Sequence, residues 1–427
     1  MPIPARALFH LLFLGMLSMS AFAADIEVQP GQKTLARAID EARSGDRLLL
    51  LDGIYGGGVT ITRPLRIEGN GRSHVKGAEK GSVITIDAPD VLVSGLIITG
   101  SGSDHQTIDS GVQLTKKAKA ARVRNNHFEG NLYGVDVHGA RDAIISDNTI
   151  IGRTDRLMNR RGNGVYVWNA PGAKVIGNSM KFGRDGIFVN SSKNNTFRNN
   201  RLESLRFAIH YMYADNSEVS GNVSIGNHLG FAIMFTTRVK IIGNTSINDR
   251  DHGIMLNYAN KALLEGNVVI GGGEKCLFMY NANKNIMRGN RFEKCPIGIH
   301  FTGGSERNEI VGNAFIGNRT QVKFVGSRDH VWSGNYWSDH AAYDIDGDGI
   351  ADQAFRPNDT IDHILWTQPS AKLLLGSPAV QLIRWAQKEF PAFLPGGVVD
   401  DRPLMVPTPL PANFVTPADL ATREIKP

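Results

Sequence analysis

One asparagine position repeats along this chain at nearly constant spacing. It is usually preceded by Gly or Asn, and successive copies are 22 or 23 residues apart, with a single interval of 30. The copies are Asn126, Asn148, Asn178, Asn200, Asn222, Asn244, Asn267, Asn290, Asn313 and Asn335. Short runs between them alternate in polarity, as in Val165-Tyr166-Val167, which indicates strands with one buried face.

A repeat of about 22 residues with two or three short strands is typical of a parallel β-helix, in which each coil stacks on the last. Asn suits the turns because it tolerates the left-handed conformation, and Asn side chains stacked in register can hydrogen-bond to one another. The pattern predicts an all-β fold, a right-handed parallel β-helix of about ten coils, with a helical N-terminal cap and a helical or extended C-terminal cap.

The limits of the repeat divide the 427 residues into five expected segments. Residues 1–23 are typical of a signal peptide, because Arg6 precedes a short apolar stretch and Ala21-Phe22-Ala23 fits a cleavage site. The other segments are an N-terminal cap (24–47), the β-helix (48–338), an acidic loop and junction (339–368), and an amphipathic helix with a Pro-rich, partner-docking tail (369–427). No later apolar run reaches about 18 residues, so we expect an exported protein without a transmembrane helix.

Local signals predict two helices in the caps and one long loop. The first helix is expected over 34–42, and the second over 379–390 with Ser377 as its N-cap. The single long interval contains a basic loop at 153–161. Nucleic-acid binding is disfavoured elsewhere, because the 47 basic and 41 acidic residues are interleaved.

Aligning the coils on a small residue followed by an aliphatic one separates inward from outward side chains, because strand residues alternate between faces. The aliphatic residue and the residue two further on, Phe235 in one coil, are expected to point inward. The outward column between them is Asp136, Tyr166, Phe188, His210, Met234, Met255, Phe278 and His300. The next outward column is His138, Trp168, Asn190, Met212, Thr236, Asn257, Tyr280 and Thr302. These are not ordinary solvent-facing residues, so the face is a candidate functional surface.

Four of these residues form a candidate Cu(I) site: His210, Met212, Met234 and Met255. In this alignment Met234 stacks beside His210, and Met255 beside Met234. Thioethers with imidazole are soft ligands that suit Cu(I) better than Zn²⁺, Mg²⁺ or Ca²⁺. The alternative is a docking surface, where Met and aromatic residues are common. His138 and His300 are interpreted as structural surface histidines.

A second metal signal lies in the acidic loop. Its candidate calcium ligands are Asp344, Asp346, Asp348, the carbonyl of Ile350, and Asp352, with Gly349 at the sixth position. Position 12 is Phe355 instead of the usual bidentate Glu, so the loop is not a true EF-hand. We expect a structural role for calcium at this junction.

The two cysteines, Cys276 and Cys295, are compatible with a disulfide in an oxidising compartment. In the coil alignment Cys295 corresponds to Gly273, three residues before Cys276. Extended strand would separate the pair by roughly 10 Å, beyond the bridging limit. Free thiols are therefore the favoured interpretation, although a corner would bring the two closer.

Catalytic patterns are scarce. The outward columns hold one carboxylate, Asp136, whereas enzymes that cleave polysaccharides use paired carboxylates or a basic residue near calcium. We expect a non-enzymatic protein. The alternatives are a carbohydrate-binding or polysaccharide-modifying β-helix, a lyase or epimerase, that stacks sugars on Tyr166, Trp168 and Phe188, or a purely structural partner.

Motifs near the C-terminus resemble those of the NosD family, the periplasmic β-helix accessory proteins of nitrous oxide reductase. They lie at 298–308, 334–352, 377–387 and 393–405, and the likeness covers about residues 26–405. The coil repeats alone are unspecific, because many sugar-acting proteins share them. The C-terminal motifs are specific to the family.

The resemblance implies a periplasmic protein that works with an ABC-type permease and its ATPase to assemble the copper centres of nitrous oxide reductase during denitrification. Copper would come from a lipoprotein chaperone and be carried as Cu(I), without catalysis. The resemblance implies no particular ligands, but it strengthens the copper interpretation of the His and Met columns. We expect residues 369–405 to dock on the permease while the coil face presents copper to the chaperone or to apo-reductase.

Overall fold

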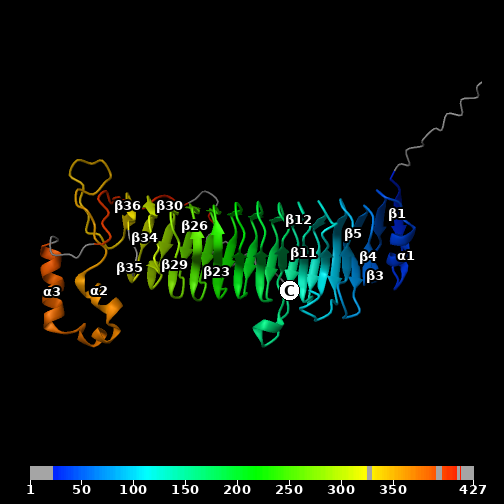
Figure 1. Cartoon of the computed structure of the whole chain (residues 1–427), viewed down its shortest axis with the longest axis horizontal. Helices are drawn as coiled ribbons and strands as arrows, with labels where there is room; N and C mark the ends of the chain where they lie inside the picture. Colours follow the sequence, from blue (N-terminus) through cyan, green and yellow to red (C-terminus); the bar gives the residue numbers. More distant parts are fainter. Residues whose placement is uncertain (1–22, 325–328, 391–396, 411–413, 415–427) are drawn as a thin grey trace, which may run out of the picture.

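The computed structural model describes residues 23–324, 329–390, 397–410 and 414, and they form an elongated parallel β-helix (Figure 1). A smaller sheet of 12 strands runs along one side. Its strands are β4 (Val59–Ile61), β6 (Ile84–Ile86), β8 (Ser110–Leu114), β11 (Tyr133–His138), β14 (Val165–Trp168), β17 (Asp185–Asn190), β20 (Phe207–Met212), β23 (Leu229–Thr237), β26 (His252–Asn260), β29 (Lys275–Tyr280), β32 (Ile297–Thr302) and β35 (Thr320–Phe324). Each strand pairs in parallel with its counterparts in the adjacent coils, which confirms the predicted fold class.

The larger sheet has 25 strands, and most coils contribute two. They are β1 (Asp25–Val28), β2 (Arg47–Leu50), β3 (Gly53–Gly56), β5 (Arg66–Lys76), β7 (Leu92–Thr99), β9 (Arg122–Arg124), β10 (His127–Glu129), β12 (Ile144–Ser146), β13 (Thr149–Ile151), β15 (Lys174–Ile176), β16 (Ser179–Lys181), β18 (Thr196–Arg198), β19 (Arg201–Glu203), β21 (Glu218–Ser220), β22 (Val223–Ile225), β24 (Lys240–Ile242), β25 (Thr245–Ile247), β27 (Leu263–Glu265), β28 (Val268–Ile270), β30 (Ile286–Arg288), β31 (Arg291–Glu293), β33 (Glu309–Val311), β34 (Ala314–Ile316), β36 (Val331–Ser333) and β37 (Tyr336–Trp337).

The repeated asparagines form a hydrogen-bonded ladder along the axis. The Oδ1 of Asn178 accepts from the backbone N–H and the Nδ2 of Asn148, at 3.0 and 2.9 Å. The same Nδ2 of Asn148 also donates to the carbonyl of Val123, in the coil before. Because each buried amide is satisfied by its neighbours, the ladder holds adjacent coils in one register.

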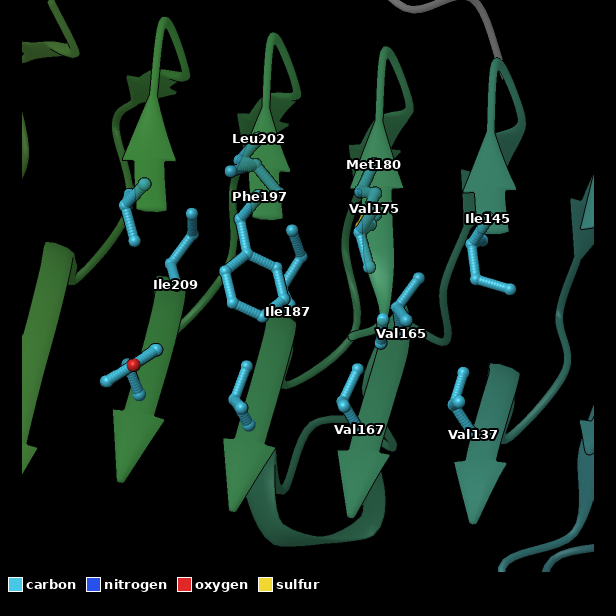
Figure 2. Close-up of a cluster of buried hydrophobic side chains, with 14 of the residues drawn as sticks. Val137, Ile145, Val165, Val167, Val175, Met180, Ile187, Phe197, Leu202 and Ile209 are labelled. Atoms are coloured by element: carbon cyan, nitrogen blue, oxygen red, sulfur yellow. The ribbon is translucent and has the colours of Figure 1, made fainter. Parts of the chain in front are cut away.

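The core lies between the sheets and is built from the alternate residues of each strand (Figure 2). In β14, Val165 and Val167 are fully buried, whereas Tyr166 and Trp168 face outward. Val175 and Met180, from the larger sheet, fill the space opposite them. The alternation predicted for the coils is therefore confirmed in this strand.

The solenoid begins earlier than the repeat suggested. β1 pairs with β2, and helix α1 (Thr34–Glu41) buries Leu35 and Ile39 at this end. The first coils carry no ladder asparagine, and the pairing of β5 with β7 shifts register between Glu68 and Ser73. A count based on Asn therefore missed these coils, and the number of coils exceeds the ten expected.

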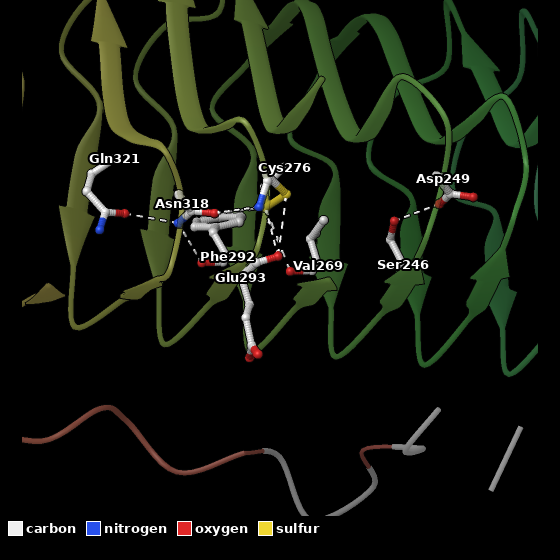
Figure 3. Close-up of a disulfide and its surroundings, with 9 residues drawn as sticks. Ser246, Asp249, Val269, Cys276, Phe292, Glu293, Asn318 and Gln321 are labelled. Carbon is white, nitrogen blue, oxygen red and sulfur yellow. Dashed lines mark hydrogen bonds between the residues drawn. A yellow bond between two sulfur atoms is a disulfide. The ribbon is translucent and has the colours of Figure 1, made fainter. Parts of the chain in front are cut away.

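The prediction of free cysteines is wrong, because Cys276 and Cys295 form a disulfide (Figure 3). Their Cα atoms are 5.7 Å apart. Cys295 lies in the turn before β32, where Asn318 Oδ1 accepts from its backbone N–H at 2.9 Å. The chain bends at this corner, so the extended-strand distance does not apply.

Residues 397–410, the closing segment, return to the last coil and close the end of the solenoid. Asp400 is fully buried, and its Oδ2 accepts from the N–H and Nδ2 of Asn335, both at 2.9 Å, and from Trp337 Nε1 at 3.0 Å. Its other oxygen accepts from Gly334 N–H at 3.0 Å. The carboxylate thus takes the place of the next asparagine and ends the ladder.

Two α-helices separated by a short 3-10 segment precede this closing segment. They are α2 (Thr360–Thr367), η2 (Pro369–Leu374) and α3 (Pro378–Glu389). Ser377 caps α3 by accepting from Val380 N–H at 3.3 Å, as predicted. Among the described residues, no helix is both long enough and apolar enough to cross a bilayer.

Replacing Asp400 with Ala should loosen this end of the solenoid alone. The change removes the acceptor shared by three buried donors and the acceptor of the part-buried Gly334 N–H, and it should cost about 3 kcal/mol locally. Hydrogen exchange should become faster at 331–337 and stay unchanged near Asn200. Asp401→Ala, at the exposed neighbouring residue, is the control. Unchanged exchange at 331–337 in Asp400→Ala would contradict the capping role.

A second prediction concerns Asp249, a fully buried carboxyl group that accepts from Ser246 and Ser224 at 2.6 and 2.7 Å. Burial raises its pKa to about 7, and these hydrogen bonds offset part of the rise. Because the folded pKa lies above the unfolded one, the group lowers stability as pH rises from about 4 to 7. Asp249→Asn should remove that loss, by roughly 2–4 kcal/mol at pH 8, with little change at pH 4.

The measurement is the melting temperature of both proteins between pH 4 and 8. Asp249→Ala serves as a contrast, because it leaves the same hydroxyls unsatisfied and should destabilise at every pH. Parallel pH profiles for the wild type and Asp249→Asn would refute the assignment.

Candidate metal-binding face

The outer face of the smaller sheet carries the predicted column, with one residue exchanged. Strand pairing aligns Asp136, Tyr166, Phe188, His210, Ala232, Met255, Phe278, His300 and Lys323. Tyr166 stacks on Phe188 with centroids 5.3 Å apart, and Phe188 on His210 at 4.6 Å. These side chains lie outside the core, as parity predicted.

The register expected for β23 is wrong by two residues. Ala232 pairs with His210, and Met234 pairs with Met212. Met255 pairs with Ala232, so it is not the strand neighbour of Met234. In β23 a small residue is followed by a bulky one at two places. Phe231 occupies the inward position equivalent to Ile209, but the alignment required an aliphatic residue after the small one and therefore selected the second place.

Two further expectations fail for the same reason. Phe235 was expected in the core, but it lies at the surface with a φ of 49°, stacked between Tyr213 and Tyr258. Thr236 was expected to face outward, but it is buried, and its hydroxyl donates to the carbonyl of Ala214.

The corrected register groups the four candidate copper ligands around Ala232. His210 and Met255 are the neighbours of Ala232 on the two adjacent strands. Met234 follows two residues later on the same strand, and Met212 is the strand partner of Met234. The three methionines are partly exposed. Ala232 is the smallest side chain of this part of the column and is fully buried, so the larger donor side chains surround and cover it.

His210 is held in place by an ion-pair cluster. Its Nδ1 lies 3.1 Å from Oδ2 of Asp185. Arg206 donates one hydrogen bond to each oxygen of the same carboxylate, at 2.7 Å to Oδ1 and 2.6 Å to Oδ2. Burial would raise the pKa of Asp185, but the hydrogen bonds from His210 and Arg206 outweigh it and lower the pKa. A carboxylate on one imidazole nitrogen orients the ring and leaves the other nitrogen for a metal.

Asp185 belongs to neither outward column of the coil alignment, so the sequence pattern assigned it no role. In the structure it begins β17 and pairs with Phe207, so it faces outward beside His210. The pairing of β17 with β20 skips the glycine that follows it, so strict alternation does not hold at this point. Arg206, two residues before Ala208, was the available signal for an ion pair with Asp185, because Arg and Asp form strong bidentate pairs.

A second pair of imidazoles lies further along the face. His252 and His300 both contact the Phe278 ring, at 5.1 and 5.4 Å. Neither Nδ1 has a hydrogen-bond partner within the described chain. Burial, with Lys323 and Lys275 nearby, lowers the pKa of His300 to about 4 and keeps the ring neutral. His252 precedes the aligned columns, so the sequence pattern gave no signal for it.

The other end of the column is closed by Asp136. This carboxyl group is fully buried. Burial raises its pKa to about 7, and a hydrogen bond from Gln113 offsets part of the rise. His138 lies 4.0 Å from it and stacks on Trp168 at 4.2 Å. The contacts of His138 are those of a packed surface residue.

Comparison with known proteins identifies the family. The model described as "Periplasmic copper-binding protein (NosD)" matches residues 150–342. The chain is 38% identical over 378 residues to the probable ABC transporter binding protein NosD of Stutzerimonas stutzeri, which covers 84% of this chain and 87% of that protein. The Pseudomonas aeruginosa protein of the same description is 38% identical over 376 residues, covering 84% and 88%. The chain belongs to the NosD family.

Solved structures resemble this NosD-family protein in fold alone. A family 28 exopolygalacturonase from Yersinia enterocolitica superposes with a TM-score of 0.57 at 11% identity, covering 72% of this chain and 78% of the enzyme. At such low identity the likeness extends to the β-helix and carries no activity.

The acidic loop of this chain brings three of the predicted calcium ligands together. Carboxylate oxygens of Asp344, Asp346 and Asp348 lie within 4.8 Å of one another. Backbone hydrogen bonds from Gly349 and Gly347 lower the pKa of Asp344. A hydrogen bond from Asp348 lowers the pKa of Asp346, but the neighbouring carboxylates outweigh it and raise the pKa.

The remaining two predicted ligands fix the shape of this loop. Asp352 accepts from Ile345 N–H at 2.8 Å, and Ile350 forms an isolated bridge with Leu404 of the closing segment. Calcium binding here stays a prediction. It would join the loop and the closing segment at the end of the solenoid, because carboxylate crowding favours a hard cation.

Calcium should therefore raise the melting temperature of the protein. At roughly a hundredfold excess over the Kd, binding to the folded state alone adds about 2.7 kcal/mol. Asp346→Asn with Asp348→Asn should abolish the response, whereas Glu309→Gln, an exposed acid elsewhere, should keep it. Equal melting temperatures with calcium and with a chelator in the wild type would overturn the site.

Proposed function

We propose that this protein is a periplasmic, non-enzymatic accessory protein that delivers copper, with an ABC permease and its ATPase, during assembly of nitrous oxide reductase. Its family is described as periplasmic and copper-binding, and its relatives are described as probable ABC transporter binding proteins. A lipoprotein copper chaperone would supply the copper, and apo-reductase would receive it.

The observation that carries the copper role is the set of donors around Ala232. Three thioethers and one oriented imidazole lie on neighbouring strands of a rigid sheet, with no acidic residue among them. Strands about 4.8 Å apart place such side chains within reach of one ion. Soft thioether and imidazole donors favour Cu(I) and leave Ca²⁺ and Mg²⁺ without suitable ligands. Partial exposure lets a partner exchange the ion.

The C-terminal helices support docking on a membrane protein. Leu373 is 91% exposed, and Leu382 and Trp385 of α3 are 62% and 56% exposed. Exposed apolar side chains of this size, gathered on the terminal helices, suit an interaction surface. They lie at one end of the solenoid, away from the copper face on β20, β23 and β26 (Figure 1). We infer that the permease binds this end and leaves the face free for the chaperone and the reductase.

Copper binding is tested by anaerobic competition with a chromophoric Cu(I) chelator. Met212→Leu, Met234→Leu and Met255→Leu together keep the apolar volume and remove the sulfur atoms, so the fold should persist and Cu(I) affinity should fall by at least about tenfold. Met158→Leu, in the basic loop, is the matched control. Equal affinity in the triple variant and the wild type would remove the site.

A carbohydrate role is the competing outcome. It predicts that oligosaccharides quench the fluorescence of Trp168 or are converted to products. The triple Met variant should leave that response unchanged, because it touches neither Tyr166, Phe188 nor Trp168. Sugar binding without copper binding would replace the present proposal.

A further inference from the structure

Three bulky aromatic residues occupy a left-handed backbone position that favours Gly or Asn. Tyr213, Phe235 and Tyr258 have φ values of 48°, 49° and 50°. Asn169 holds the equivalent position earlier in the solenoid, and Asn281 holds it later. A bulky residue in the left-handed region is an outlier that costs of order 1 kcal/mol or more, so three in succession indicate that the rings are needed at this surface.

The rings form a continuous exposed ridge. Tyr213 stacks on Phe235 at 4.9 Å and Phe235 on Tyr258 at 5.2 Å, and Tyr280 meets the edge of Tyr258 at 5.7 Å. Tyr213 is 55% exposed and Tyr258 is 41% exposed. The ridge adjoins the candidate copper site directly, since Met212 precedes Tyr213 and Met234 precedes Phe235.

A row of cations runs parallel to this aromatic ridge. Arg238, Lys261, Lys284 and Arg307 hold the next left-handed turn position on four successive coils. Backbone hydrogen bonds between those coils keep the four in step. All four are exposed, and in the described part of the chain none makes an ion pair. An open groove of about 590 Å³ lies here, lined by Thr237, Asn260, Lys261, Asn283, Lys284, Gly304, Glu306 and Arg307.

We propose that the ridge and the cation row together form a docking surface for an acidic protein. Unpaired cations about 4.8 Å apart match carboxylates on an extended segment or a strand edge. Tyrosine is enriched in protein interfaces, and its hydroxyl adds a polar contact beside apolar area. Glu306 is the one carboxylate in the groove lining, so the surface stays basic. This surface is independent of copper binding.

An anionic polysaccharide fits the same cations less well. Sugars pack against the open faces of aromatic rings, but here neighbouring rings cover one another, with interplanar angles of 14° and 13°. The ridge offers edges and hydroxyl groups instead. Those groups suit a protein surface, so the polysaccharide is an outcome of the test.

The test starts with photo-cross-linking in the native periplasm. Tyr280 is replaced by benzoylphenylalanine, and Tyr343, which is 50% exposed in the acidic loop, carries the same group as a positional control. The protein captured at 280 alone is identified by mass spectrometry, purified and titrated against the full-length protein. The cross-linked peptide should be rich in Asp and Glu. Capture of a glycan at 280, or equal capture at both positions, would overturn the proposal.

Charge reversal and ring removal then separate docking from folding. Lys261→Glu with Lys284→Glu should weaken binding of the captured protein about tenfold or more and flatten its salt dependence. Arg122→Glu with Lys174→Glu, on the larger sheet, changes the charge equally and should have no effect. Tyr258→Asn should keep the melting temperature, because Asn tolerates a φ of 50°, and still weaken binding several-fold. Unchanged affinity in both ridge variants would refute the surface.

Discussion

The hydrogen bond between stacked asparagines is the interaction on which this molecule depends. Each buried amide accepts from the coil before it and donates to that coil's backbone, so neighbouring coils have one register that satisfies every group. A slip by one residue would bury the outward columns and break the ladder at once. The ladder therefore decides which outward side chains become neighbours, and the candidate site on β20, β23 and β26 is a consequence of it.

A solenoid also needs its ladder closed at both ends, and the two ends differ. At the N-terminus, α1 covers the first coil with Leu35 and Ile39. At the C-terminus, Asp400 accepts the hydrogen bonds that a further asparagine would have taken. A carboxylate suits this position because it only accepts hydrogen bonds, and the last coil has N–H donors that no further coil can accept from. The closing segment also contacts the acidic loop through Leu404, so the fold couples any ion bound there to the end of the ladder.

Local patterns made much of this structure predictable from sequence. The Asn spacing, the alternation in Val165–Trp168 and the cap at Ser377 each depend on residues close together in the chain. Asp400 could not be placed, because its partner Asn335 lies 65 residues earlier. Met234 was misaligned because Phe231 and Ile233 both point inward, and composition alone does not say which begins the pattern. The same approach failed at Cys295, which lies in the turn before β32, and at Asp185, where the strand pairing skips the next residue.

The arrangement of the outer face suggests how cargo and partner would meet. The proposed copper ligands Met212 and Met234 directly precede Tyr213 and Phe235 of the proposed docking ridge. A protein seated on that ridge would cover the thioethers at the same time, with no movement of the coils. Covering removes water from around the ion and favours exchange between two sets of soft ligands over loss to solvent. A rigid solenoid therefore suits a carrier whose docking and metal surfaces must keep a fixed spacing, while the exposed helices at its end stay available to a membrane partner.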